Sequence, residues 1–161
     1  MDYYPRATFV VLGLVIVQTM FLSYVSIGGI VPDILLIWVV YLAVTRGQLE
    51  ATIAGFLVGL LQDATTTQFF GLAALAKTMA GFTGGYFFNE NKTEQTLGTY
   101  RFMIIVVVCS LAHNIVYFAI FLQGETALFE RLLQFSATTA LYTGAMSALP
   151  MFAFSRKFLT T

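Results

Sequence analysis

Residues 49–85 read LEATIAGFLVGLLQDATTTQFFGLAALAKTMAGFTGG, which places one apolar run, 49–62, and most of a second, 71–88, on either side of a short polar turn. Both runs repeat a pattern every four residues: Ala51, Gly55, Gly59 and Asp63 in the first, and Ala73, Lys77, Gly81 and Gly85 in the second. Residues four apart lie on one face of a helix. Small residues at this spacing let two helices approach closely in a membrane. We expect tight packing within the chain, the alternative being a docking face for another protein's membrane helix.

Four further apolar runs, 7–27, 32–45, 102–122 and 132–154, complete the pattern. The chain has 161 residues, of which 58% are hydrophobic and 10% charged, with a mean hydropathy of +0.83. A soluble domain has about 25% charged residues, so this chain lacks the polar surface of one. The sequence therefore predicts an all-α membrane protein, a six-transmembrane-helix bundle that forms a single integral membrane domain over residues 1–161 in contact with lipid.

The second and third predicted helices, 32–45 and 49–62, are short. Fourteen residues span roughly 21 Å as a helix, which is less than the roughly 30 Å of hydrocarbon in a bilayer. These two helices must therefore thin the membrane, be sheltered by neighbouring helices, or form a re-entrant hairpin.

The basic residues predict the orientation of the chain. With the N-terminus placed inside, six of the eight fall on the inner side: Arg6, Arg46, Lys92, Arg101, Arg156 and Lys157. Arg131 falls outside and Lys77 lies within a run. Short cytoplasmic loops carry an excess of lysine and arginine, so both termini are expected in the cytoplasm. The polar stretch 89–99 becomes an inner loop. The formal net charge is zero, which leaves no basic patch for nucleic acid.

Lys77 is the ionisable residue well inside a predicted span, roughly 9 Å from its outer end at about 1.5 Å per residue. A charge there needs a partner, water, or a route to the interface. Asp63 ends the third run, and Pro32-Asp33 begins the second, both on the outer side. We expect a Lys77–Asp63 ion pair, with Asp33 as the alternative partner. The remaining alternative is an unpaired lysine whose long side chain snorkels to the membrane interface.

Gln18, His113 and Asn114 lie near the middle of predicted helices and could form a buried polar cluster. Hydrogen bonds between helices are the ordinary role of such groups in membranes. If they met Lys77 around one apolar pocket of several hundred Å³, a small-molecule-binding transporter component would be favoured instead. Cys109 is the only cysteine, and one cysteine with one histidine falls short of the four ligands of structural zinc. We expect no cofactor, no metal and no enzymatic activity. Pro150 should bend the last helix near Met146, whose carbonyl it frees.

Three separate segments carry a resemblance to a known family: Pro32–Ile37 (PDILLI), Gly55–Asp63 (GFLVGLLQD) and Gly71–Lys77 (GLAALAK). In these segments the chain resembles the rod shape-determining membrane proteins called MreD. The rest agrees more loosely, through Pro150 and the Arg156-Lys157 tail. By position, Pro32, Asp33, Gly55, Gly59 and Asp63 match the family's motif, and we expect them to shape the fold and, as a further option, a partner face; Lys77, Gly81 and Gly85 extend that set.

The resemblance implies a bacterial inner-membrane protein of the cell-elongation machinery, or elongasome, without enzymatic activity. It implies the single-span membrane protein MreC as a partner, together with the MreB cytoskeleton, the glycosyltransferase RodA and a class B penicillin-binding protein, all acting in peptidoglycan synthesis. It also implies a fold similar to the substrate-binding S-components of energy-coupling-factor transporters. The leading expectation is a non-catalytic scaffold, and an S-component-like transporter subunit is the alternative.

Overall fold

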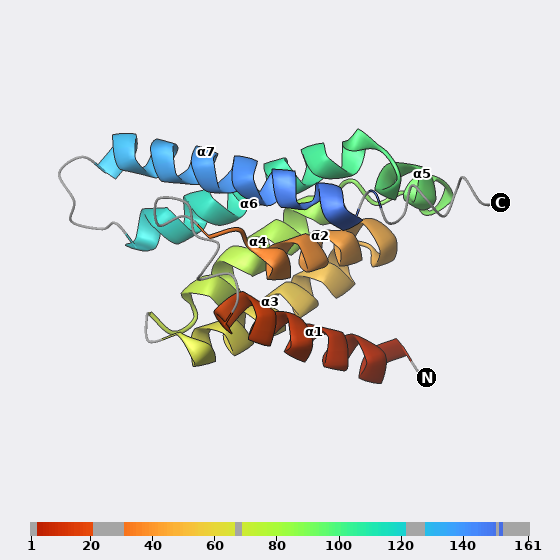
Figure 1. The fold of residues 1–161 in the computed structure, drawn as a ribbon, viewed down its shortest axis with the longest axis horizontal. Coiled ribbons are helices and arrows are strands. Elements are labelled where there is room, and N and C mark those ends of the chain that lie inside the picture. Colours follow the sequence, from red (N-terminus) through yellow and green to blue (C-terminus); the bar gives the residue numbers. More distant parts are fainter. Residues whose placement is uncertain (1–2, 21–30, 67–68, 122–127, 151, 153–161) are drawn as a thin grey trace.

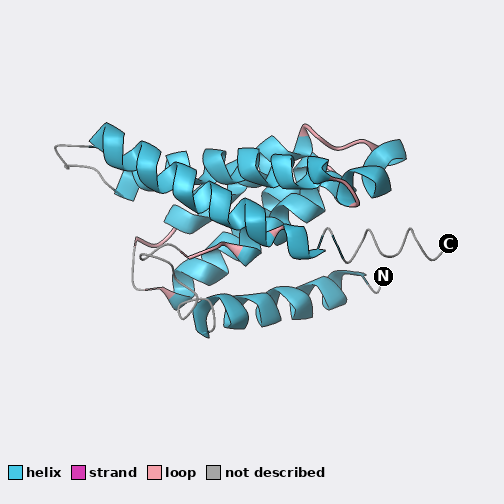
Figure 2. Cartoon of the chain, turned by 45° about the horizontal axis from the view of Figure 1, so that its top comes forward, coloured by secondary structure: helices cyan, strands magenta, loops and turns pink. Residues whose placement is uncertain are grey.

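The computed structural model describes residues 3–20, 31–66, 69–121, 128–150 and 152, and its regular elements are all helices (Figures 1 and 2). In chain order they are α1 (Tyr3–Met20), α2 (Ile34–Arg46), α3 (Gln48–Thr65), α4 (Leu72–Gly85), the 3-10 helix η2 (Glu90–Lys92), α5 (Thr93–Leu97), α6 (Tyr100–Phe121) and α7 (Leu128–Met146). Each of the six longer helices overlaps one of the six predicted runs. Predicted residues 21–27, 122, 151, 153 and 154 lie outside the described residues.

Three boundary predictions were wrong. The third predicted helix, 49–62, is not short, because α3 has 18 residues and spans roughly 27 Å. It extends past Asp63 and ends at Thr65. The predicted inner loop 89–99 also holds structure, namely η2 and the five-residue α5. The last helix was predicted over 132–154, but α7 runs from Leu128 to Met146. Ser147 is a turn residue three positions before Pro150, near the point where the bend was expected.

Helix α2 is short, with 13 residues, and it is sheltered by its neighbours. One side of it, including Leu36 and Val40, packs in a cluster with Phe102 and Val106 of α6. The side at Leu35 packs in a second cluster that includes residues of α1 and α3, among them Val11, Val15 and Val58. This sheltering is one of the three arrangements that the short run allowed.

A single residue, Gly47, separates α2 from α3. Its φ is +94°, a region that residues with a Cβ rarely adopt and that glycine reaches at little cost. Its N–H also bonds to the carbonyl of Ala43 and closes the last turn of α2. The two helices can therefore reverse direction within one residue.

Helices α3 and α4 pack backbone against backbone along their small-residue stripes. A Cβ built on Gly59 would lie 2.3 Å from the Ala74 Cα, and one built on Gly55 would lie 2.5 Å from the Lys77 carbonyl oxygen. From the other helix, a Cβ on Gly81 would lie 2.4 Å from the carbonyl oxygen of Ala51. A Cβ on Gly85 would lie 2.3 Å from the Cα of Gln48. The two stripes face each other, so internal packing occupies them and neither is left open for another protein's helix.

The termini of several helices gather at one end of the bundle. The start of α1, the end of α7 and the short α5 lie together at the right of Figure 1. Three exposed basic residues belong to elements that end or begin there: Arg46 at the end of α2, Lys92 at the end of η2 and Arg101 at the start of α6. We call this the basic end.

The outer surface of the bundle is rich in large apolar side chains. Exposed examples occur on α1, α3, α4, α6 and α7: Phe9, Ile16, Ile53, Leu57, Leu75, Phe82, Ile104, Ile115, Leu133 and Leu141. By length and hydropathy, α6 is the one helix among the described residues that meets the criterion for crossing a membrane. The chain is therefore a helical protein with a candidate membrane-spanning segment and an apolar exterior.

Candidate functional site

Asp33, which precedes α2, lies beside the buried ammonium group of Lys77. Its Oδ1 accepts a hydrogen bond of 2.9 Å from the Leu36 N–H and caps the helix. Its Oδ2 forms an ion pair with the Nζ of Lys77, whose side chain is 0% exposed. Asp33, named as the alternative partner, is thus the partner of Lys77. A buried ammonium is tolerable because a carboxylate lies beside it.

Asp63 does not pair with Lys77, so the preferred prediction was wrong. Its carboxylate accepts three backbone hydrogen bonds at the start of α4, from the N–H groups of Gly71 at 3.0 Å, Ala73 at 3.1 Å and Ala74 at 3.1 Å. The first N–H groups of a helix lack partners within it, and the helix N-terminus favours negative charge. Asp63 near the end of α3 therefore caps α4 and ties the start of α4 to α3.

Gln18 of α1 holds the chain in front of α2. Its Nε2 donates to the Pro32 carbonyl at 3.0 Å, and its Oε1 accepts from the Ile34 N–H at 2.9 Å. Thr143 of α7 adds a third contact, since its Oγ1 accepts from the Asp33 N–H at 3.2 Å. Residues of α1, α4 and α7 thus fix the position of Asp33.

His113 and Asn114 of α6 lie on the same side of the bundle but make different contacts. The Nε2 of His113 lies 3.8 Å from the Oδ2 of Asp33, and its ring stacks on Tyr117 with centroids 5.9 Å apart. Asn114 donates through Nδ2 to the Ser136 carbonyl at 3.3 Å and to Ser110 Oγ at 3.4 Å. Asn114 therefore ties α6 to α7, whereas His113 faces the ion pair.

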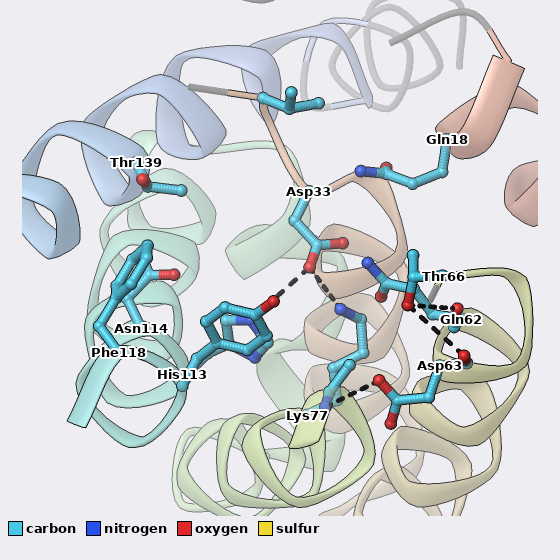
Figure 3. Close-up of a pocket in the computed structure, with 13 residues that line it drawn as sticks. Gln18, Asp33, Gln62, Asp63, Thr66, Lys77, His113, Asn114, Phe118 and Thr139 are labelled. Atoms are coloured by element: carbon cyan, nitrogen blue, oxygen red, sulfur yellow. Dashed lines mark hydrogen bonds and ion pairs between the residues drawn. The ribbon is translucent and has the colours of Figure 1, made fainter. Parts of the chain in front are cut away.

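These side chains surround a cavity of about 170 Å³ (Figure 3). We call it the Asp33 cavity. Of the residues predicted to form a buried polar cluster, Gln18, His113 and Asn114 all line it, together with Lys77. The convergence that would favour a small-molecule site is therefore present. The volume, however, lies below the roughly 300–1,000 Å³ of drug-sized ligand pockets.

Sequence reasoning did not predict several cavity residues: Gln62, Thr66, Tyr117 and Phe118. Gln62 is the most informative of these, because its Oε1 is a buried oxygen without a hydrogen-bond partner in the described part of the chain. Its place beside Asp63 in the sequence was the available signal. Thr143, which supports Asp33 from a distance of 110 positions, had no such signal.

The charged groups at this site have partners within the protein. Within the described residues, no three His, Cys, Asp or Glu side chains gather as a metal site would require. Cys109 is buried in the cluster around α2 and α6, away from the cavity lining. The carboxylates of Asp33 and Asp63 are engaged in the ion pair and the helix caps just described.

Comparison with known families gives one finding that covers nearly the whole chain. The family described as "rod shape-determining protein MreD" matches residues 6–161. Comparisons with curated proteins and with solved structures gave no match. The similarity to S-components therefore stays a prediction. The matched range contains all of the residues around the Asp33 cavity.

Proposed function

Because the chain belongs to the MreD family of rod shape-determining proteins, we propose that it is a non-catalytic scaffold of the bacterial cell-elongation machinery. In this role it binds the single-span protein MreC in the inner membrane. It thereby helps to organise peptidoglycan synthesis with MreB, RodA and a class B penicillin-binding protein. Membership of the family indicates a role in rod-shape determination. The binding of MreC and the other named partners is our proposal.

The observation that best supports a membrane scaffold is the division between the inside and the outside of the bundle. The charged groups Asp33, Asp63 and Lys77 are buried and have partners, whereas the outward faces carry side chains such as Phe9 and Leu141. Lipid is the environment in which such an exterior is stable. We propose a single integral membrane domain of six spans, with α2 crossing inside the shelter of its neighbours.

The orientation proposed is with both termini in the cytoplasm. Arg46, Lys92 and Arg101 would then lie on the cytoplasmic side, as the positive-inside rule requires. The end of α3, the start of α4 and the buried ion pair would lie toward the periplasm. The glycine stripes of α3 and α4 are already packed against each other. A periplasmic partner with one membrane helix must therefore bind the lipid-facing surface of the bundle or its exposed ends.

The direct test is affinity purification of the tagged full-length chain from native membranes in mild detergent. We expect MreC to be recovered with it. A tagged Gly59→Leu variant serves as a control, because a side chain at this position meets the Ala74 backbone and should disrupt the fold and the capture together. Recovery of an ATPase module in place of MreC would contradict the scaffold.

A small-molecule transporter component is the second candidate function. It is favoured by one observation, the meeting of Gln18, Lys77, His113 and Asn114 around a common cavity. It ranks second because the cavity volume of about 170 Å³ is small for a transported metabolite. The same purification separates the two functions, since a transporter component would bring its ATPase module.

A further inference from the structure

From the Asp33 cavity we infer a binding site for a small neutral molecule that carries a carbonyl or amide group next to a compact ring. This inference goes beyond the scaffold function, since a scaffold can hold a ligand without transporting it. The cavity is built from side chains of α1, α3, α4, α6 and α7 and lies where α2 and α4 begin (Figure 3).

The size of the cavity limits the ligand to a fragment. Its volume is about 170 Å³, and an engineered cavity of about 150 Å³ in another protein holds a benzene molecule. A six-membered ring with one polar substituent, such as benzamide, therefore matches the space available. Larger metabolites do not fit without movement of the helices.

The charges of the cavity favour a neutral ligand. Lys77 offsets the charge of Asp33, and Asp63 is held by three N–H groups at the start of α4. The N-termini of α2 and α4 each add roughly half a positive charge. Together they offset the negative charge of Asp63, which the Lys77–Asp33 pair leaves over. A charged ligand would lose its hydration on entering the cavity, and every opposite charge there already has a partner.

Two side chains offer hydrogen bonds to such a ligand. An ammonium group has three N–H donors, and Asp33 occupies one donor of Lys77. The Lys77 side chain is closed to solvent in the structure, so a ligand carbonyl reaches a second donor when this side chain turns toward the cavity. The buried Oε1 of Gln62 is an acceptor without a partner among the described residues. An amide matches this pair, because it presents one carbonyl oxygen and two N–H donors.

Aromatic side chains line the part of the cavity nearest α6. Tyr117 and Phe118 both belong to the lining, and His113 stacks on the Tyr117 ring. Aromatic rings pair favourably in stacked or edge-to-face arrangements. The polar groups of Lys77 and Gln62 thus lie across the cavity lining from rings that can accept the ring of the ligand (Figure 3).

Three probes of nearly the same shape and different charge test this site: benzamide, the benzoate anion and the benzamidinium cation. Binding is measured by saturation-transfer NMR on the full chain in lipid nanodiscs, with empty nanodiscs as the blank. We expect benzamide binding to have a Kd below about 10 mM. A ligand of nine non-hydrogen atoms reaches this affinity at a modest binding free energy per atom. The two charged probes should bind at least about tenfold more weakly because the cavity offers them no free counter-charge.

Two variants and one matched control locate the binding. Thr139→Phe fills the cavity from α7 and should abolish benzamide binding, whereas Thr138→Phe, at an exposed neighbour outside the lining, should leave it unchanged. Gln62→Leu removes the unpartnered acceptor and should weaken binding by about three- to tenfold. Each variant is first checked for an unchanged unfolding temperature.

Three results would overturn the inference: no saturable benzamide signal, equal or tighter binding of either charged probe, or benzamide binding that persists in Thr139→Phe. Recovery of MreC by the tagged chain is a separate measurement. Failure of ligand binding therefore leaves the scaffold function standing, and failure of MreC capture leaves the ligand site standing.

Discussion

The Lys77 ammonium of α4 pairs with the Asp33 carboxylate in front of α2, across 44 positions of sequence. Asp33 also caps α2 through Leu36. The ion pair therefore joins the start of one helix to the middle of another inside the bundle. Removing one member of such a pair leaves an uncompensated charge in a buried place.

Lys77→Met should lower the free energy of unfolding by about 3–5 kcal/mol, because it leaves the Asp33 carboxylate without its counter-charge. Combining it with Asp33→Asn should restore part of that loss, since the second change removes the stranded charge. The measurement is a double-mutant cycle on thermal unfolding or folded yield in detergent. Strictly additive losses would show that the two side chains are not in contact.

Asp63→Ala should cost about 0.5–2 kcal/mol of stability, the usual loss for an N-cap. The effect should be local, because this carboxylate accepts hydrogen bonds from Gly71, Ala73 and Ala74. Hydrogen exchange read at those amides is the check, with Asp63→Asn as the milder variant that keeps one acceptor oxygen. Unchanged exchange there, together with faster exchange around Lys77, would favour the ion pair first expected from the sequence.

Gly59→Ala tests the contact between α3 and α4. The added methyl would lie 2.3 Å from the Ala74 Cα, so the helices must separate, and overpacking of this kind costs about 1–3 kcal/mol. Gly13→Ala is the matched control, because a Cβ there meets nothing within 4 Å and alanine favours a helix over glycine. The two variants should shift the unfolding temperature in opposite directions, and a stable Gly59→Ala protein would rule out the close packing.

Two features could be predicted from the sequence on physical grounds: the helices themselves, and the close contact between α3 and α4. Apolar runs mark the segments that lipid can surround, and each run overlaps one of the six longer helices. Glycines every four residues mark a backbone contact, which the structure places between Gly59 and Ala74. Both features can be recognised from residue patterns within a single short segment of the chain.

The details that the sequence did not give depend on groups that carry no local pattern. Asp63 had two competing partners, the Lys77 ammonium and the backbone N–H groups of α4. The choice between them depends on where the end of α3 lies relative to the start of α4, which no local pattern in the sequence specifies. The contact from Thr143 to Asp33 spans 110 positions and involves an ordinary threonine. The helix α5 was missed because its five residues, TEQTL, are mostly polar and lie in a loop-like stretch.

The most direct test of the central claim, a membrane bundle with its basic end in the cytoplasm, is cysteine accessibility in intact cells. Cys109, which is buried, is first replaced by alanine, and single cysteines are introduced as Phe69→Cys beyond α3 and Glu94→Cys on α5, both at exposed positions. An impermeant thiol reagent should label the cysteine at position 69, and it should label position 94 only after the inner membrane is opened. Labelling of position 94 in intact cells would contradict the orientation and the placement of the Asp33–Lys77 pair on the periplasmic side.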